Sequence, residues 1–209
     1  MTHPLLPGTI APLVVSLLIT ATASAQRSGS TISSEQIFEA IGLQDGMTVC
    51  EIGAGDGELS LAAARIVGPN GRVFSSELGT ARVKTLQEKV TSSGLDQITV
   101  VTGDGASTNF PDMACDALFM RNVYHHFEVP DEMNASILAA LKDGGRAAVV
   151  DFAPTGNEAE RSADRDTGDS HGVSADTVSR EMAAAGFQPL SSERGGGRWY
   201  MVVVTKPRR

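Results

Sequence analysis

A stretch of alternating glycines, Gly53, Gly55 and Gly57, places the strongest constraint on how this chain folds. The residues before it are apolar and end in an acid at Glu51, and a helical pattern of apolar residues resumes at Leu59. Glycine lets the backbone adopt positive φ and lets a ligand approach without a Cβ in the way, while the free N–H groups of a helix start favour an electron-rich ligand. The stretch is therefore predicted to be a strand, a tight turn and a helix start that form a nucleotide-type site.

Strands and helices are predicted to alternate along the rest of the chain. The later strands are predicted over residues 72–76, 98–102, 117–120 and 146–152, with a closing pair at 187–190 and 199–205. The helices are predicted over residues 35–41, 59–67, 80–92 and 131–141, with a last one from 174 to a stop at 186. Residues 142–145 are expected to be a turn. This alternation implies right-handed crossovers and an α/β fold with a doubly wound, mostly parallel sheet.

The first 25 residues differ from the rest because they contain no Lys, Arg, Asp or Glu, and they run apolar from residue 10 to residue 19. Ala23-Ser24-Ala25 has the small-x-small pattern of a cleavage site, so residues 1–25 are predicted to be a secretory signal peptide. Residues 26–34 read as a linker and 35–209 as one domain, which suits a chain of 209 residues. The mature protein is expected to be exported, without stable membrane association. An uncleaved anchor and a misassigned start codon, which would leave the protein cytoplasmic, stay open.

Charge and cysteine content exclude several classes of function. The net charge is -8, without the basic surplus that binds a phosphate backbone, so no nucleic-acid partner is expected. Two cysteines, Cys50 and Cys115, are too few for a disulfide framework and lack the spacing of a zinc site. We interpret both as small buried hydrophobic residues. The histidines also lack carboxylates at ligand spacing, so no metal is predicted.

Polar residues follow four of the predicted strands where each strand ends. Glu51 ends the first strand, Glu77 the second, and Asp104 follows the third, while Arg121 and Asn122 follow the fourth. The carboxyl ends of parallel strands meet at one edge of the sheet, where ligands bind. Glu77 lies about twenty residues beyond the glycines, the separation at which an acid can accept hydrogen bonds from both hydroxyls of a ribose. Together these residues favour a nucleoside site.

The glycine spacing narrows the choice of nucleoside. A dinucleotide fingerprint is GxGxxG, whereas Gly53, Gly55 and Gly57 lie at alternate positions, two residues after Glu51. A carboxylate so close would repel a pyrophosphate but would suit the ammonium group of an amino acid. The predicted ligand therefore combines a ribose with an amino-acid tail, as in S-adenosylmethionine.

From residue 35 to residue 206 the chain resembles the class I S-adenosylmethionine-dependent methyltransferases. Residues 51–57 (Glu-Ile-Gly-Ala-Gly-Asp-Gly) look like the first motif of that family, and residues 119–127 are similar to its fourth-motif region. The resemblance implies a seven-stranded sheet with an antiparallel C-terminal strand, and S-adenosylmethionine as the cofactor. The cofactor contacts that it implies are Glu51, Gly53, Ala54, Gly55, Gly57, Glu77, Leu78, Asp104, Gly105, Arg121 and Asn122. The family usually works in the cytosol, which conflicts with the predicted signal peptide.

Methyl transfer needs a base only if the accepting atom carries a proton. Tyr124, His125 and His126 directly follow the fourth strand, beside the expected methyl position, and are the candidate catalytic residues. The polar residues 154–172 are predicted to be an exposed loop, either a lid over the site or disordered. His171 closes this loop, as a solvated turn residue or as a group that reaches the mouth of the site.

We therefore expect a methyltransferase that acts on a small molecule or an exposed protein group. Two alternatives stay open: an exported protein that binds S-adenosylmethionine or a nucleoside without catalysis, and a nicotinamide-dependent oxidoreductase, which the glycine spacing disfavours. The methyl acceptor, the atom methylated and the oligomeric state do not follow from the sequence.

Overall fold

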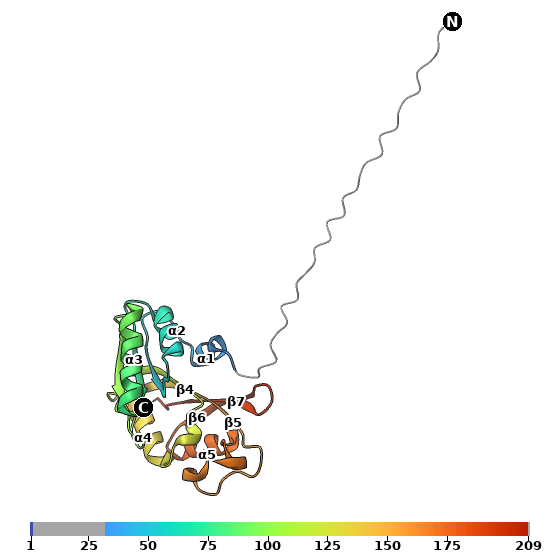
Figure 1. Cartoon of the computed structure of the whole chain (residues 1–209). Helices are drawn as coiled ribbons and strands as arrows, with labels where there is room; N and C mark the ends of the chain where they lie inside the picture. The colour runs from blue at the N-terminus through green and yellow to red at the C-terminus, as the bar shows by residue number, and fades with distance from the viewer. Residues whose placement is uncertain (2–31, 209) are drawn as a thin grey trace.

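Seven strands form a single sheet in a computed structural model that describes Met1 and residues 32–208 (Figure 1). The strands are β1 (Thr48–Ile52), β2 (Arg72–Glu77), β3 (Ile98–Thr102), β4 (Cys115–Arg121), β5 (Leu141–Phe152), β6 (Gln188–Arg194) and β7 (Trp199–Thr205). Their order is β3-β2-β1-β4-β5-β7-β6. The strands β1 to β5 pair in parallel, and β7 runs antiparallel to both β5 and β6. The predicted fold class, with its antiparallel C-terminal strand, is confirmed.

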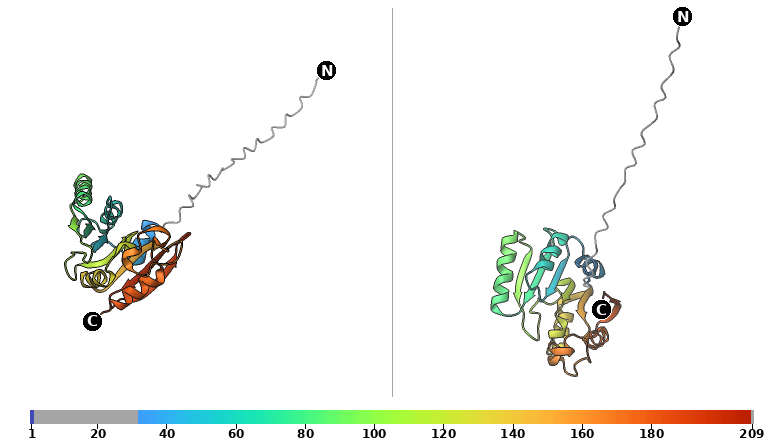
Figure 2. Two further views of the ribbon diagram at one scale, coloured as in Figure 1. Left: turned by 60° about the horizontal axis from the view of Figure 1, so that its bottom comes forward. Right: turned by 45° about the vertical axis from the view of Figure 1, so that its right-hand side comes forward.

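Five helices cover the two faces of the sheet (Figure 2). They are α1 (Ser34–Ile41), α2 (Glu58–Val67), α3 (Thr80–Ser93), α4 (Pro130–Ala140) and α5 (Ala175–Ala184). The first three pack on one face and the last two on the other, as in a doubly wound sheet. Ser33 begins α1 with a capping box, because its side chain accepts from the Gln36 N–H and the Gln36 side chain accepts from the Ser33 N–H.

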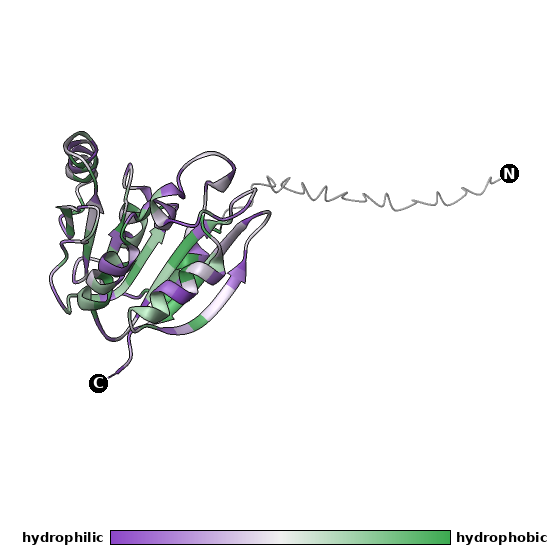
Figure 3. Cartoon of the chain, turned by 90° about the horizontal axis from the view of Figure 1, so that it is seen from below, coloured by the Kyte–Doolittle hydropathy of each residue, from purple (hydrophilic) through white to green (hydrophobic). Residues whose placement is uncertain are grey.

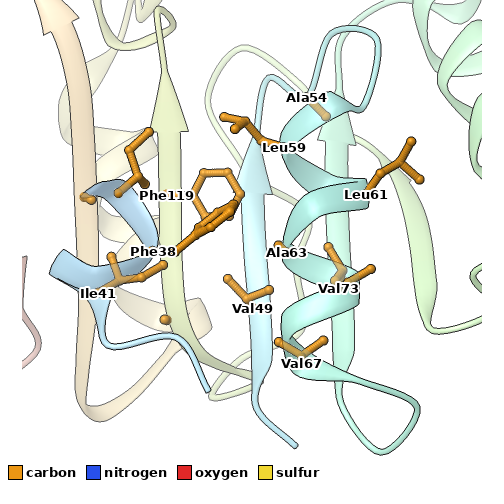
Figure 4. Close-up of a cluster of buried hydrophobic side chains, with 14 of the residues drawn as sticks. Phe38, Ile41, Val49, Ala54, Leu59, Leu61, Ala63, Val67, Val73 and Phe119 are labelled. Atoms are coloured by element: carbon orange, nitrogen blue, oxygen red, sulfur yellow. The ribbon is translucent and has the colours of Figure 1, made fainter. Parts of the chain in front are cut away.

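Buried apolar residues alternate between the two faces of the central strands. In β4, Ala117 and Phe119 face the cluster under α1 and α2, whereas Leu118 and Met120 face the cluster under α4 and α5. Figure 4 shows Phe119 against Phe38 of α1, and the two ring centroids lie 5.5 Å apart. Figure 3 shows that hydrophobic residues are concentrated on the central strands. The core is therefore two apolar layers, one on each side of the sheet.

Several strands are longer than predicted, among them β4, which spans Cys115–Arg121 instead of residues 117–120. Residues 142–145 belong to the start of β5 instead of forming a separate turn, because the chain passes directly from α4 into the sheet, where Cys115 pairs with Leu141. The predicted turn residues instead form an irregularity within β5. Gly144 has a φ of 79°, and the pairing with β4 shifts register opposite it. The strand β6 runs to Arg194 because it pairs with β7 as far as Tyr200. The hairpin predicted at the three glycines is present.

The interpretation of the two cysteines as separate buried residues was incomplete. Both are fully buried, but Cys50 of β1 and Cys115 of β4 form a disulfide, with Cα atoms 5.9 Å apart. The two residues are 65 positions apart in the sequence and meet because the sheet places β4 beside β1. The disulfide therefore joins two central strands whose carboxyl ends carry predicted site residues.

The N-terminal predictions fall largely outside the described residues. The signal peptide and nearly all of the linker lie within residues 2–31, so they stay predictions. Among the residues that the structure describes, no helix combines the length and hydrophobicity needed to span a bilayer.

Candidate active site

The loop after β1 has the backbone conformation that its glycines allow. Gly53, Gly55 and Gly57 have φ values of 69°, 57° and 81°, which side chains rarely adopt. A Cβ at Gly53 would collide with the side chain of Val123, whereas a Cβ at Gly55 would meet no atom within 4 Å. The loop therefore packs tightly on one side and borders open space at Gly55.

Glu77 joins this loop to the end of β2. Its Oε2 accepts a hydrogen bond from the Gly55 N–H at 2.6 Å, and its Oε1 accepts from the Leu78 N–H at 2.8 Å. The residue is only 5% exposed, and the guanidinium of Arg82 lies 3.7 Å from Oε1. Each carboxylate oxygen has a further lone pair, so Glu77 can hold the loop and still accept from a ligand.

Glu51 is a buried acid beneath the same loop. Burial raises its pKa to about 8, against the opposing effects of the Ser60 hydroxyl and the positive charge of Arg121. The Ser60 hydroxyl donates to the Glu51 carboxyl group and also contacts the Ser75 hydroxyl. Glu51 is therefore largely neutral at pH 7 without a ligand. The prediction that a negative charge on Glu51 repels a pyrophosphate is therefore weakened. Glu51 instead acts as a hydrogen-bonding group that links β1 to α2.

One cavity of about 680 Å³ collects the polar groups from the strand ends. Of the predicted cofactor residues, ten line it: Glu51, Gly53, Ala54, Gly55, Glu77, Leu78, Asp104, Gly105, Arg121 and Asn122. Gly57 does not. It precedes α2, and a Cβ there would meet Leu86 at 2.8 Å, so its place is structural. The cavity is large enough for a nucleoside cofactor together with a small second ligand.

The carboxyl ends of β3 and β4 complete the cavity wall. Asp104 Oδ1 accepts from the N–H groups of Ala106 and Ser107, so this carboxylate shapes the turn after β3 and keeps its other oxygen for a ligand. Arg121 lies 3.6 Å from Glu58 at the start of α2. Asn122 adopts a φ of 63°, which asparagine tolerates, and its N–H donates to the Val150 carbonyl. All these residues reach the cavity from separate strand ends.

The three candidate catalytic residues point in different directions, because they occupy one short 3-10 turn (Tyr124–His126). Tyr124 is fully buried away from the cavity, where Asn134 Nδ2 donates to its hydroxyl at 2.7 Å and the hydroxyl donates to Glu181. Burial raises the pKa of Tyr124, so it is unsuited to be a base. His125 is also buried. Tyr124 and His125 are therefore not placed to touch a substrate, and His126 alone of the three lines the cavity.

His125 and Asp151 hold the turn in place. Asp151 Oδ1 lies 2.9 Å from His125 Nδ1, and its Oδ2 accepts from the His125 N–H at 3.1 Å. The other ring nitrogen, Nε2, lies 3.2 Å from Nε2 of His171. His171 therefore contacts a buried histidine and does not reach the cavity mouth.

His126 meets the requirements of a base. Burial lowers its pKa below the usual 6.5, the positive charge of His125 acts in the same direction, and the nearby Asp151 and Asp166 oppose the shift. The imidazole is therefore neutral at pH 7 and can accept a proton from a group in the cavity.

Residues 154–172, which we call the strap, are anchored to the rest of the protein. They do not form the disordered segment that the sequence left as one alternative. Arg165 is 5% exposed and forms two hydrogen bonds to the Glu181 carboxylate, at 2.6 and 3.2 Å. The Ser162 hydroxyl donates to the Glu128 carbonyl at 2.6 Å. The strap thereby brings Asp166 into the cavity wall.

Comparison with known proteins supports the resemblance. Residues 49–145 match the family model described as a methyltransferase domain. A SAM-dependent methyltransferase from Aquifex aeolicus superposes with a TM-score of 0.72 at 21% identity, over 84% of this chain and 90% of that one. Residues 49–145 are therefore similar to a methyltransferase domain, and the fold is that of the class I methyltransferases that the sequence resembles.

Further comparisons show how far the similarity extends. The chain is 32% identical over 120 residues to the ubiquinone/menaquinone biosynthesis C-methyltransferase UbiE of Pseudomonas paraeruginosa. The aligned segment covers 55% of this chain and 45% of that relative. The chain thus matches about half the length of that relative. The [4+2]-cyclase SpnF superposes on this chain with a TM-score of 0.73 at 19% identity, over 84% of this chain and 81% of that one. The fold alone therefore does not define the reaction.

Asp166 is one of the cavity residues that the sequence did not predict, and Arg82 and Glu128 are others. The strap reads as an undivided run of charged residues, and its placement depends on the pairing of Arg165 with Glu181 of α5. Within residues 32–208, no group of three or more His, Cys, Asp or Glu side chains has the arrangement of a metal site.

Proposed function

We propose that this chain is an S-adenosylmethionine-dependent methyltransferase that acts on a small molecule. One observation carries the proposal: four adjacent strand ends deliver the glycine loop, Glu77, Asp104 and Arg121 into a single cavity that also contains His126. The match of residues 49–145 to the methyltransferase domain supports it.

The residues of the cavity fit S-adenosylmethionine. A Cβ at Gly55 or Gly105 would meet nothing within 4 Å, so the backbone there is accessible to a ligand. Leu78 is an apolar side chain that is 48% exposed at the cavity wall, suitable for packing against an adenine ring. Glu77 has lone pairs for ribose hydroxyls, and the glycine loop lies where the amino-acid tail would bind.

The chain's own residues then position the acceptor and take its proton. When bound, S-adenosylmethionine supplies a methyl group on a sulfonium, and the carbon–sulfur bond breaks as the acceptor attacks the methyl carbon, which leaves a neutral thioether. If the accepting atom carries a proton, the neutral His126 imidazole takes it. The cavity residues align the two reactants, which is the main protein contribution to this reaction.

The names of the relatives favour a small-molecule acceptor, and that of the UbiE protein favours methylation at carbon. Such an acceptor would be a phenol or a related carbon nucleophile, because loss of a phenolic proton makes both its oxygen and the ring carbons beside it nucleophilic. His126 can act as the base for methylation at either the oxygen or the ring carbon.

Calorimetry with S-adenosylmethionine and with its demethylated product tests the cofactor proposal. Binding of neither ligand at sub-millimolar concentration contradicts it. We predict that Glu77→Ala weakens binding of the product by roughly 1–3 kcal/mol, because the partner groups lose a buried acceptor. Glu88→Ala, on the exposed face of α3, is the matched control and should leave the affinity unchanged. Unchanged affinity in Glu77→Ala, with the fold verified by thermal unfolding, would remove Glu77 from the site.

We further propose that the protein is exported. The predicted signal peptide favours export, and the disulfide between Cys50 and Cys115 supports it independently, because disulfides persist in oxidising compartments. An exported enzyme needs a cofactor that is made in the cytosol. This difficulty favours a second candidate function, an exported binding protein with the same cavity, which predicts cofactor binding without methyl transfer to any acceptor offered.

A further inference from the structure

The part of the cavity around His126 has a distinct chemical character. Its apolar wall comes from Val123, Phe127 and Met133, which suit a flat or hydrocarbon group. Two carboxylates, Glu128 and Asp166, also line it. We call this part of the cavity the acceptor end, because the predicted cofactor residues occupy the remainder.

The side chain of Asp166 is exposed, but its neighbours in the chain are anchored. Arg165, the preceding residue, is buried and bonded to both oxygens of Glu181. On its other side the strap is tied by the Ser162 hydroxyl to the backbone carbonyl of Glu128. These two anchors hold the strap over the acceptor end, so that Asp166 and Glu128 reach the same space from different elements.

Positive charge in the cavity is already paired elsewhere. Among the described lining residues, the guanidinium groups belong to Arg82 and Arg121, which lie 3.7 Å from Glu77 and 3.6 Å from Glu58. Arg121 is one of the predicted cofactor residues, and Arg82 pairs with another of them, Glu77. At the acceptor end, within the described residues, the remaining basic group is His126, which is neutral at pH 7. A carboxylate or phosphate there would meet two negative charges without a countercharge.

We propose that Asp166 selects the methyl acceptor by charge, favouring a small molecule with an ammonium group over a neutral one, and a neutral one over an anion. The inference rests on the proposed function and specifies the substrate class of that site. The apolar wall holds the body of the acceptor, His126 faces the reacting group, and Asp166 pairs with the ammonium group at the far end.

Three phenols of similar shape test this order: tyramine, 4-ethylphenol and 4-hydroxyphenylpropanoate. They share the phenol and differ in charge at the other end. Binding of each is measured by calorimetry on the full mature chain saturated with the demethylated cofactor, and methyl transfer is measured with S-adenosylmethionine. We expect tyramine to bind about fivefold more tightly than 4-ethylphenol, the size typical of one accessible ion pair, and the carboxylate to bind most weakly. The tyramine advantage should shrink at high salt.

The Asp166→Asn substitution tests whether this carboxylate, and not the overall negative charge of the protein, causes the preference for tyramine. It should bring the affinity for tyramine to within about twofold of that for 4-ethylphenol, while the affinity for 4-ethylphenol stays the same. Asp169→Asn is the matched control, because Asp169 belongs to the same strap and is exposed outside the cavity. That variant should keep the fivefold preference.

Several outcomes overturn the inference. Equal binding of the three phenols, binding of none of them, or preference for the carboxylate by the cofactor-loaded chain contradicts the charge selection. A preference that persists in Asp166→Asn excludes this residue as its cause. Failure of the demethylated cofactor to bind at all is a different result, which overturns the proposed function.

Discussion

At the scale of single residues, the protonation state of His126 decides whether a bound phenol can lose its proton. We predict that His126→Asn lowers kcat/KM for tyramine by about 100-fold or more and leaves the affinity for the demethylated cofactor unchanged. Because the neutral imidazole is the active form, activity should fall as pH drops through the pKa of His126. Burial lowers that pKa, so the acidic limb of kcat/KM should lie below pH 6.5.

The carboxylate of Asp166 provides a check on this assignment. Its negative charge raises the pKa of His126, so Asp166→Asn should move the acidic limb to still lower pH. A limb that is unaffected by both substitutions would show that His126 is not the base.

The convergence of the glycine loop, Glu77 and Asp104 on one cavity could be predicted from the sequence, because each lies at the end of a strand and parallel strands place their carboxyl ends together. Their contacts with a cofactor stay a prediction. The choice among Tyr124, His125 and His126 could not be made, because neighbouring residues of a tight turn face different directions and the orientation depends on the clamp by Asp151.

At the scale of elements, the ion pair between Arg165 and Glu181 is a main anchor of the strap. The Arg165 side chain is 6% exposed, and its removal would leave the largely buried Glu181, 15% exposed, without this countercharge. We predict that Arg165→Ala lowers the free energy of unfolding by about 3 kcal/mol, as for other broken buried pairs. It should also weaken tyramine binding while cofactor affinity persists. Urea unfolding and calorimetry measure the two effects.

Arg161→Ala is the control within the same strap. The side chain of Arg161 is 77% exposed and pairs with Asp164 at the surface, so its removal should leave the stability nearly unchanged. Equal effects of the two substitutions would show that the strap is not anchored through Arg165.

The elements themselves were largely predictable, and their exceptions have clear causes. Hydrophobic patterns and turn residues are local, so the helices and most strands follow from them. The true start of β5 and the length of β6 depend on pairing with Cys115 and with β7, which no local pattern contains. The disulfide was missed for a related reason, although the predicted doubly wound order would have placed Cys50 and Cys115 on neighbouring strands.

At the scale of the whole molecule, the disulfide links stability to the compartment in which the chain folds. It closes a loop across 65 positions, for which the loss of chain entropy in the unfolded state corresponds to about 4 kcal/mol. Both cysteines are fully buried, so the folded protein should resist a reductant, whereas the unfolded chain should not. Urea unfolding should therefore show a midpoint that a reductant lowers, and the double variant Cys50→Ala, Cys115→Ala should lack this response.

The state of the two cysteines also provides a test of export. A chain that begins at Met1 should be recovered from the exported fraction of its host with a mass that reports cleavage after Ala25 and no thiol open to alkylation. A chain that begins at Gln26 stays in the reducing cytosol, where it should bear two alkylated cysteines once unfolded and be less stable by about 4 kcal/mol. Recovery of the full-length chain from the cytosol with both thiols free would contradict export. That result would also place the enzyme beside its cofactor supply and remove the main support for a binding protein without catalysis.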